Sequence, residues 1–211
     1  KQMGGNDIDV GSAICLDPSG NIYLTGYFGG TVDFDPNAGV QNLTTNGFYD
    51  AFICKLDNDG NYLWAKNVGS NSFDEGKGIG TDAAGNVYTT GYFRLTADFN
   101  TDAGILNLSS FGDTDIFVLK LSQDGTFQWA KQLGGGSTDQ SFSMAVDGFG
   151  NSYLTGYFLG TADFNPDAGV NNLSAAGSSD VFVCKLSDAG SFVWAKNVGS
   201  TSFDEARSIT L

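Results

Sequence analysis

The sequence predicts an all-β protein made of three tandem copies of one folding unit. The strongest observation is a repeat of 65 residues without insertion or deletion, which Trp64, Trp129 and Trp194 mark. A second is a series of short β-branched and aromatic segments between turns, with 30 glycines and 3 prolines among 211 residues. No segment shows a helical spacing of apolar residues. A fixed period of this size indicates a unit that buries its faces against neighbouring copies.

Four strands are expected in each copy, and the second copy shows them most clearly. Residues 78–82 and 87–93 form the first pair across a turn that contains Gly-Asn. Residues 115–121 and 126–133 form the second pair across a turn that contains Asp124-Gly125. Glycine and aspartate suit these tight turns, because glycine adopts positive φ and aspartate bonds to nearby backbone amides.

The third strand of each copy is apolar on both faces. In the first copy, Phe52 and Cys54 point to one side, and Ala51 and Ile53 point to the other. Such a strand is covered by other structure on both sides. A radial array of four-stranded sheets explains the pattern, because each sheet then lies between two neighbours, as in the blades of a β-propeller.

The link between the second and third strands is too long for a plain loop. In the first copy, residues 30–34 and 40–44 are expected to pair across residues 35–39, which gives each blade an extra hairpin on its rim. The expected division is the end of a preceding blade at 1–10, blades at 11–75, 76–140 and 141–205, and the start of a further blade at 206–211.

The linked motifs of each copy resemble a known repeat. Asp82 to Tyr92, Asp115 to Gly125, and Gly134-Gly135 follow the order of the SBBP-type β-propeller repeat of bacterial surface and secreted proteins, and all three copies match. The resemblance implies a location outside the cell or on its surface, and it implies no common activity. Because propellers close with roughly 4–8 blades, further repeats or other copies of the chain are expected partners.

The hairpin loops carry the candidate metal site. Oxygen side chains at the first, third and fifth positions are how calcium loops gather ligands, so calcium is the candidate cofactor. Against calcium, the sixth position holds alanine and the twelfth holds threonine or serine. The alternative is a turn whose aspartate and asparagine side chains cap backbone amides. The candidate ligands are Asp33, Asp35 and Asn37, then Asp98, Asn100 and Asp102, and finally Asp163, Asn165 and Asp167.

Three other sets of residues are notable. Tyr27 and Phe28, with their counterparts, are expected to pack between blades, and the alternative is stacking on sugar rings from an exposed rim. Six repeated carboxylates are expected to bond to backbone amides in tight turns, namely Asp50, Asp115 and Asp180, and Asp74, Asp139 and Asp204. The cysteines are expected to be free and buried, at Cys15, Cys54 and Cys184.

Charge and composition argue against several classes of function. A net charge of −14 disfavours nucleic acid as a partner, because binding it needs clustered lysine and arginine. No apolar run reaches the ~18 residues of a membrane span. The chain has no histidine, so catalysis by a histidine acid or base is not available to it.

The expected function is a non-catalytic extracellular scaffold with a structural, adhesive or protein-binding role at the cell surface, stabilised by calcium if the loops bind it. A glycan-binding module is one alternative. A subunit of a ring or filament, joined head to tail through ends at the same phase of the repeat, is another. A hydrolase would need a non-repeated acidic pair lining a central channel.

Overall fold

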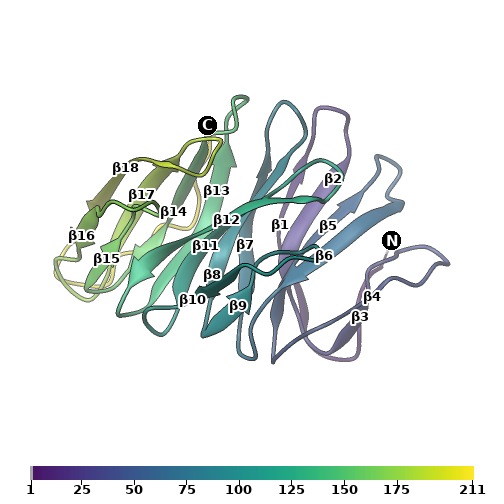
Figure 1. Ribbon diagram of the computed structural model, residues 1–211, viewed down its shortest axis with the longest axis horizontal. Helices are drawn as coiled ribbons and strands as arrows, with labels where there is room; N and C mark the ends of the chain where they lie inside the picture. The colour runs from purple at the N-terminus through teal and green to yellow at the C-terminus, as the bar shows by residue number, and fades with distance from the viewer. Residues whose placement is uncertain (1) are drawn as a thin grey trace.

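The protein is all-β, as predicted, and a computed structural model describes residues 2–211. Lys1, at the start of the segment expected at 1–10, lies outside the described residues. Three four-stranded antiparallel sheets stand side by side in an arc, each with a two-stranded hairpin (Figure 1). Within residues 2–211 there is no helix with the length and apolarity to cross a membrane.

Each sheet has four strands that follow one another from the inner to the outer edge of the arc. From inner to outer strand, the first sheet contains β1 (Asp9–Leu16), β2 (Ile22–Phe28), β5 (Asp50–Leu56) and β6 (Tyr62–Val68). The second contains β7 (Glu75–Thr81), β8 (Val87–Phe93), β11 (Asp115–Leu121) and β12 (Phe127–Gly135). The third contains β13 (Asp139–Val146), β14 (Ser152–Phe158), β17 (Asp180–Leu186) and β18 (Phe192–Val198).

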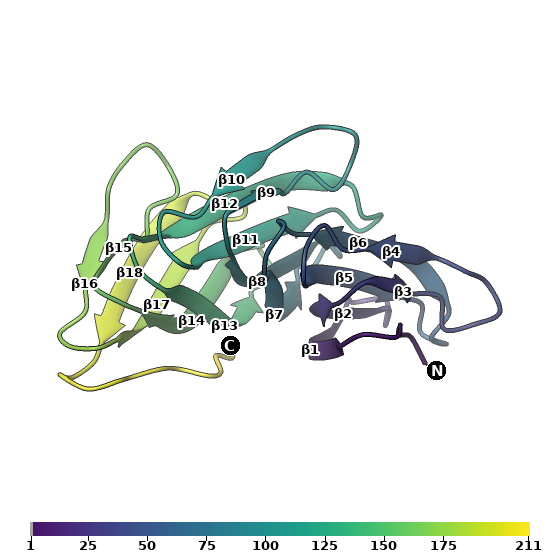
Figure 2. The same ribbon diagram turned by 90° about the horizontal axis from the view of Figure 1, so that it is seen from below.

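The predicted extra hairpins are present in all three units. They pair β3 (Thr31–Asp33) with β4 (Asn42–Thr44), β9 (Thr96–Asp98) with β10 (Asn107–Ser109), and β15 (Thr161–Asp163) with β16 (Asn172–Ser174). Figure 2 shows β1, β7 and β13 gathered along the inner edge of the arc and the hairpins on its outer side. The hairpins therefore form the rim that the sequence predicts.

Two strands of the second sheet extend beyond their predicted bounds. β8 and β11 begin and end where the sequence places them, whereas β7 begins at Glu75 and β12 continues to Gly135. The extension of β12 has a clear cause, because Gly134 and Gly135 pair with Asp163 and Ala162 of β15 in the next unit. A partner from another unit thus lengthens a strand whose local sequence ends earlier.

The third strands are covered on both faces, as predicted. Every residue of β5 and of β11 is buried. β17, at the end of the arc, instead alternates between buried and half-buried residues. The alternation follows from position, because no further sheet within residues 2–211 covers the outer face of β17.

A glycine in each second strand permits close contact with the first strand. A Cβ at Gly26, Gly91 or Gly156 would lie within 2.0 Å of a backbone carbonyl oxygen of the paired strand. The pairing is irregular at this level in every sheet, with register shifts at Gly11/Ala13, Gly76/Gly78 and Ser141/Ser143. The bulge presses the carbonyl onto the glycine, and this explains why each copy has glycine at this position.

The chain ends in a segment that lies beside the third sheet. Residues 204–211 form no strand, but the Ile209 amide donates to Ser143 Oγ at 3.2 Å and the Ala206 amide donates to the Gly156 carbonyl at 3.4 Å. In the repeat, this segment corresponds to β1, β7 and β13. It therefore takes the place that the inner strand of a further sheet would occupy.

Candidate functional site

The first oxygen of each predicted metal loop closes the hairpin. Asp33 Oδ1 accepts the amide hydrogens of Asp35 at 3.0 Å and Gln41 at 2.8 Å. Asp98 and Asp163 repeat both contacts in their own hairpins. The Gln41 and Asp35 amides hold the pKa of Asp33 below its usual value, because they stabilise the charged carboxylate.

The third and fifth positions serve the same turn and also connect neighbouring units. Asn100 Oδ1 accepts the Asp102 amide at 3.0 Å. Asp102 accepts the Phe127 amide at 2.8 Å and also pairs with Lys66 of the first sheet at 3.1 Å. The Phe127 amide, then Lys66, lowers the pKa of Asp102. The third unit has the same arrangement, in which Asp167 accepts the Phe192 amide and pairs with Lys131.

The geometry of the loops therefore matches amide capping. Asp35 Oδ1 accepts the amide of Asn37, and Asn165 Oδ1 accepts that of Asp167. Across residues 2–211, no three histidine, cysteine, aspartate or glutamate side chains form a group that could hold a metal ion. Calcium at the loops stays a prediction, and chelation is its test.

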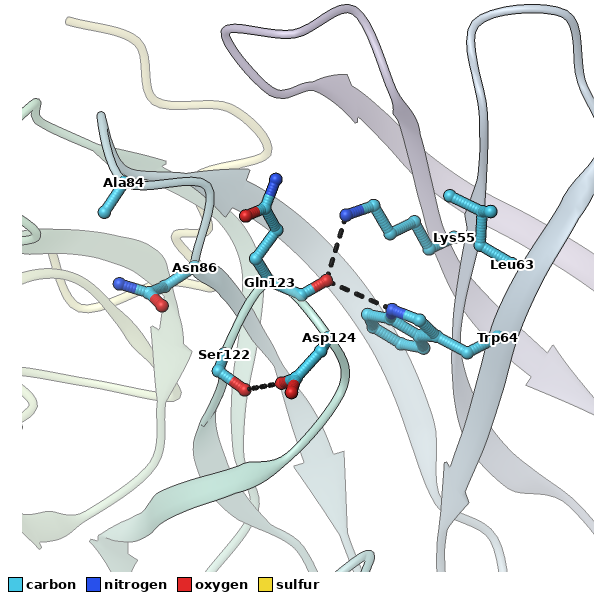
Figure 3. A pocket seen from close by; sticks show the side chains of 8 residues that line it. All are labelled: Lys55, Leu63, Trp64, Ala84, Asn86, Ser122, Gln123 and Asp124. Atoms are coloured by element: carbon cyan, nitrogen blue, oxygen red, sulfur yellow. Dashed lines mark hydrogen bonds between the residues drawn. The ribbon is translucent and has the colours of Figure 1, made fainter.

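A recurring contact between neighbouring sheets was not predicted. A lysine and a tryptophan of one sheet hold the turn between the third and fourth strands of the next, and the lysine lies over the ring of a tyrosine of its own sheet. We call these three residues the turn clamp. In the first sheet they are Tyr23, Lys55 and Trp64. Figure 3 shows Lys55 Nζ and Trp64 Nε1 converging on the Gln123 carbonyl, at 2.9 and 3.2 Å.

The clamp borders a solvent-open groove of about 700 Å³ between the first two sheets (Figure 3). The Trp64 ring lies against Gly125, where a Cβ would be 2.9 Å from the indole. Gly125 also has φ of +83°, which side chains rarely adopt. The Asp-Gly turn of the sequence is thus a surface for the tryptophan of the preceding unit as well as a connection between strands.

The second clamp makes stronger polar contacts. Trp129 Nε1 donates to the Asp188 carbonyl at 3.1 Å, Tyr88 donates to the Asp188 carboxylate at 2.7 Å, and Lys120 forms an ion pair with that carboxylate. Lys120, then Tyr88, lowers the pKa of Asp188. The sequence contains a signal for this contact. A lysine and a tryptophan recur at fixed positions of the repeat, and a turn that contains aspartate and glycine follows about one period later.

The third clamp consists of Tyr153, Lys185 and Trp194. Lys185 Nζ lies over the Tyr153 ring, 4.8 Å from its centroid, as the equivalent lysines do at 4.9 Å in the other sheets. Trp194 is more exposed than its counterparts, because residues 2–211 contain no fourth turn to cover it. The lysine and the tyrosine of this clamp are therefore arranged as in the other two sheets, with the tryptophan more exposed.

The repeated carboxylates have the structural role expected from the sequence. Asp50 accepts the Asn67 side-chain amide at 2.7 Å, and Asp139 accepts the Gly135 amide at 2.7 Å. Burial raises the pKa of Asp50 to about 6 and that of Asp139 to about 7. Both side chains are closed off from solvent, so no substrate reaches them.

Comparison with known proteins agrees with this architecture. Residues 128–157, from β12 into β14, match the family model of SBBP, a β-propeller repeat. Within this stretch, the chain is similar to that repeat. It is also 27% identical over 229 residues to an uncharacterized WD repeat-containing protein of Acanthamoeba polyphaga mimivirus. That alignment covers 95% of this chain and 16% of the viral protein, so the chain spans about a sixth of its relative.

The repeated aromatic residues of the three units mostly form the core. Phe28, Phe93 and Phe158 are fully buried, which confirms packing for these residues. The preceding residues, Tyr27 and its two counterparts, are half-buried. The rings do not form an exposed rim for sugar stacking. Cys54 and Cys184 are free and buried, as predicted, and Cys15 is free and half-buried.

The outer hairpins instead expose an apolar residue at each tip. Val40, Ile105 and Val170 occupy the same repeat position and are 66%, 78% and 71% exposed. Directly after the first hairpin strand the chain turns inward, and Phe34, Phe99 and Phe164 are buried against the sheets. Each hairpin is therefore anchored at its base and apolar at its tip.

Proposed function

We propose that this chain is a non-catalytic β-propeller scaffold that binds protein partners through its outer hairpins. The observation that carries the proposal is the exposed apolar residue at the same tip position in all three units, Val40, Ile105 and Val170. A single exposed apolar residue is ordinary on a protein surface. Three at one repeat position, each on an anchored hairpin, form a regular set of contact points.

Rigid presentation of these tips supports the proposal. In the first hairpin, the Asp33 carboxylate accepts the backbone amides of Asp35 and Gln41 and so connects the two strands. The Phe34 ring packs against those of Phe28 and Phe52, with ring centroids 5.3 and 5.0 Å apart. A partner that meets such a hairpin does not have to order it, so less conformational entropy is lost on binding. Functional residues on loops over a rigid scaffold are common in proteins.

The comparisons support the scaffold in general terms. SBBP is a β-propeller repeat, and the viral relative is named for WD repeats. The resemblance to bacterial surface and secreted proteins leads us to place the proposed partner outside the cell or on its surface, in an adhesive or structural role. The buried phenylalanines remove the main support for a glycan-binding surface.

The test is a comparison of partner recovery by two triple variants. The tip variant is Val40→Ser, Ile105→Ser and Val170→Ser. The control changes apolar residues exposed elsewhere, Phe111→Ser, Phe149→Ser and Leu63→Ser. Immobilised proteins are incubated with surface proteins of the source cells, crosslinked and quantified by mass spectrometry.

We expect both variants to keep the circular dichroism spectrum of the original chain, because the changed residues are exposed. Proteins enriched on the original chain should remain on the control and fall at least about tenfold on the tip variant, as for loss of a binding hot spot. Equal recovery on both variants would remove the hairpin tips as the binding surface.

A further inference from the structure

We propose that a pocket at the base of the first hairpin binds an arginine side chain of a partner protein. The pocket has a volume of about 650 Å³ and is lined by residues 6–8, 29–30, 45 and 47–49. It lies where β2 ends and β5 begins, whereas the turn clamp lies where β5 ends and β6 begins. The proposal does not use the hairpin tips, so it stands or falls separately from the proposed function.

Two glycines leave room in this pocket. Gly29 and Gly30 form part of its wall. At the repeat position of Gly29, the second unit has Arg94 and the third has Leu159. The first unit therefore lacks a side chain at a position where the other two units have a long one.

The second unit shows which group the fold holds at this position. The Arg94 guanidinium lies over the Phe73 ring, with Cζ 5.8 Å from the ring centroid. Its Nη2 atom also forms an ion pair with Asp113 Oδ2 at 2.8 Å. An aromatic ring and a carboxylate attract a guanidinium in different ways, one through the face of the ring and the other through charge and hydrogen bonds. The second unit thus satisfies with its own arginine what the first unit leaves open.

The first unit offers the same two kinds of group around the empty position. A Cβ on Gly29 would lie 3.1 Å from the Cβ of Asp7 and 3.4 Å from a ring carbon of Tyr49. A Cβ on Gly30 would collide with Asp7 Oδ2. The position that a long side chain occupies in the other units therefore lies between a carboxylate and an aromatic ring.

The carboxylate of Asp7 is available to a ligand. Asp7 is exposed, and within residues 2–211 its side chain has no hydrogen bond and no ion pair. Among the described residues that line the pocket, Asp7 carries the only charge. The later copies of its repeat position hold serine, at Ser72, Ser137 and Ser202. The negative charge is thus specific to the first unit, as is the empty position beside it.

The aromatic walls of the pocket are held in place by other rings. Phe48 is 65% exposed and stacks on Phe73, with ring centroids 4.9 Å apart and planes at 8°. Tyr49 packs against Tyr27 and Phe73, at 5.4 Å from each. Because these rings are already ordered, a cation that enters the pocket does not have to arrange them.

The charge of the whole chain favours a basic partner. A net charge of −14 attracts cationic segments and repels acidic ones. Arginine suits this pocket better than lysine, because its flat guanidinium stacks on a ring and pairs with a carboxylate at the same time. The occupant that fits is therefore an arginine on an exposed segment of another protein.

The binding test uses the peptide acetyl-Gly-Ser-Arg-Ser-Gly-amide and the same peptide with citrulline, which is neutral and of similar size, in place of arginine. Each is titrated into the chain labelled with ¹⁵N, and the amide shifts of Gly29, Gly30 and Phe48 are followed. The arginine peptide should shift these amides to saturation and bind at least about tenfold more tightly than the citrulline peptide. Equal affinities, or no shift up to about 10 mM peptide, would overturn the proposal.

Free arginine distinguishes the two possible sources of a guanidinium. Its own carboxylate meets the negative charge of Asp7, so it should bind more weakly than the peptide, whose ends are neutral. Tighter binding of the free amino acid would overturn the assignment to a partner protein.

Three variants locate the site. Asp7→Asn should weaken binding of the arginine peptide at least about tenfold. Asp59→Asn removes the same charge from an exposed turn at the other end of the sheet, and it should change the affinity by less than about twofold. Equal effects of these two substitutions would reduce the contact to the general charge of the chain and overturn the pocket.

Gly29→Arg supplies the guanidinium from the chain itself, as Arg94 does in the second unit. Its Cβ requires the neighbouring side chains to move by only a few tenths of an ångström. The variant should keep the circular dichroism spectrum of the original chain and lose binding of the arginine peptide. A folded Gly29→Arg chain that binds the peptide as tightly as the original would overturn the location.

Discussion

Replacement of Gly91 by alanine tests the close contact between the first and second strands. A Cβ at Gly91 would lie 1.9 Å from the Glu75 carbonyl oxygen and 3.0 Å from a ring carbon of Phe117. Real Cβ atoms essentially never come closer than 3.0 Å to another heavy atom, so the carbonyl would have to move by about 1.1 Å. That displacement disturbs the pairing of β7 with β8 at the bulge.

The expected loss of stability follows from two terms. Overpacking of a filled interior costs about 1–3 kcal/mol. Each hydrogen bond lost from the strand pairing costs about 1 kcal/mol more. We therefore expect Gly91→Ala to lower the free energy of unfolding by about 2–4 kcal/mol, measured by urea unfolding with circular dichroism and tryptophan fluorescence.

Gly148→Ala is the matched control. A Cβ at Gly148 would have its nearest neighbour, Ala83 Cβ, at 3.9 Å, so it meets no obstruction. Both substitutions reduce the freedom of the unfolded chain to the same extent. The difference between them therefore isolates the steric contact. If the free energies of unfolding of the two variants differ by less than about 1 kcal/mol, the steric explanation of the repeated glycine is wrong.

Three further predictions concern titration, metal and thiols. Because burial raises the pKa of Asp139 to about 7 and of Asp50 to about 6, the folded state binds protons more tightly than the unfolded state. The free energy of unfolding should therefore rise by on the order of 3 kcal/mol as pH falls from about 8 to about 5, and a flat profile would contradict the burial. If the hairpin loops bind calcium, EGTA should lower the melting temperature, whereas an unchanged melting curve would retire the calcium prediction. Burial raises the pKa of Cys54 and Cys184 to about 12, so both should react with a disulfide reagent at least about a hundredfold more slowly in the native than in the unfolded protein, and rapid native labelling would show that the core opens.

Local sequence was sufficient for the sheets themselves. Strands β8 and β11 have the predicted bounds because apolar residues and turn residues delimit them within a few positions. The double-sided burial of β5 was also predicted, since Phe52, Ile53 and their neighbours leave no polar face. The hairpins could be predicted from the length of the link between the second and third strands and from the Asp-Phe pattern within it.

Contacts between units could not be predicted from the local sequence. Lys55 meets Gln123 and Trp64 meets Gly125 across about one period of the repeat, and no local pattern joins these residues. The role of Asp102 illustrates the same limit, because its pairing with Lys66 depends on how two units pack. The sequence offered calcium or amide capping for these loops, and only the fold shows the amides that surround each oxygen.

The extended β12 makes the arc mechanically uneven. β16, β15, β12, β11, β8 and β7 form one continuous hydrogen-bonded ladder, so the second and third units share backbone bonds. Within residues 2–211, backbone pairing between the first and second units is limited to the bridge between Gly69 and Asp98, and side-chain contacts such as the turn clamp make the rest of the junction. A pulling force or a rise in temperature therefore detaches the first unit before it separates the other two, and its amides exchange hydrogen soonest.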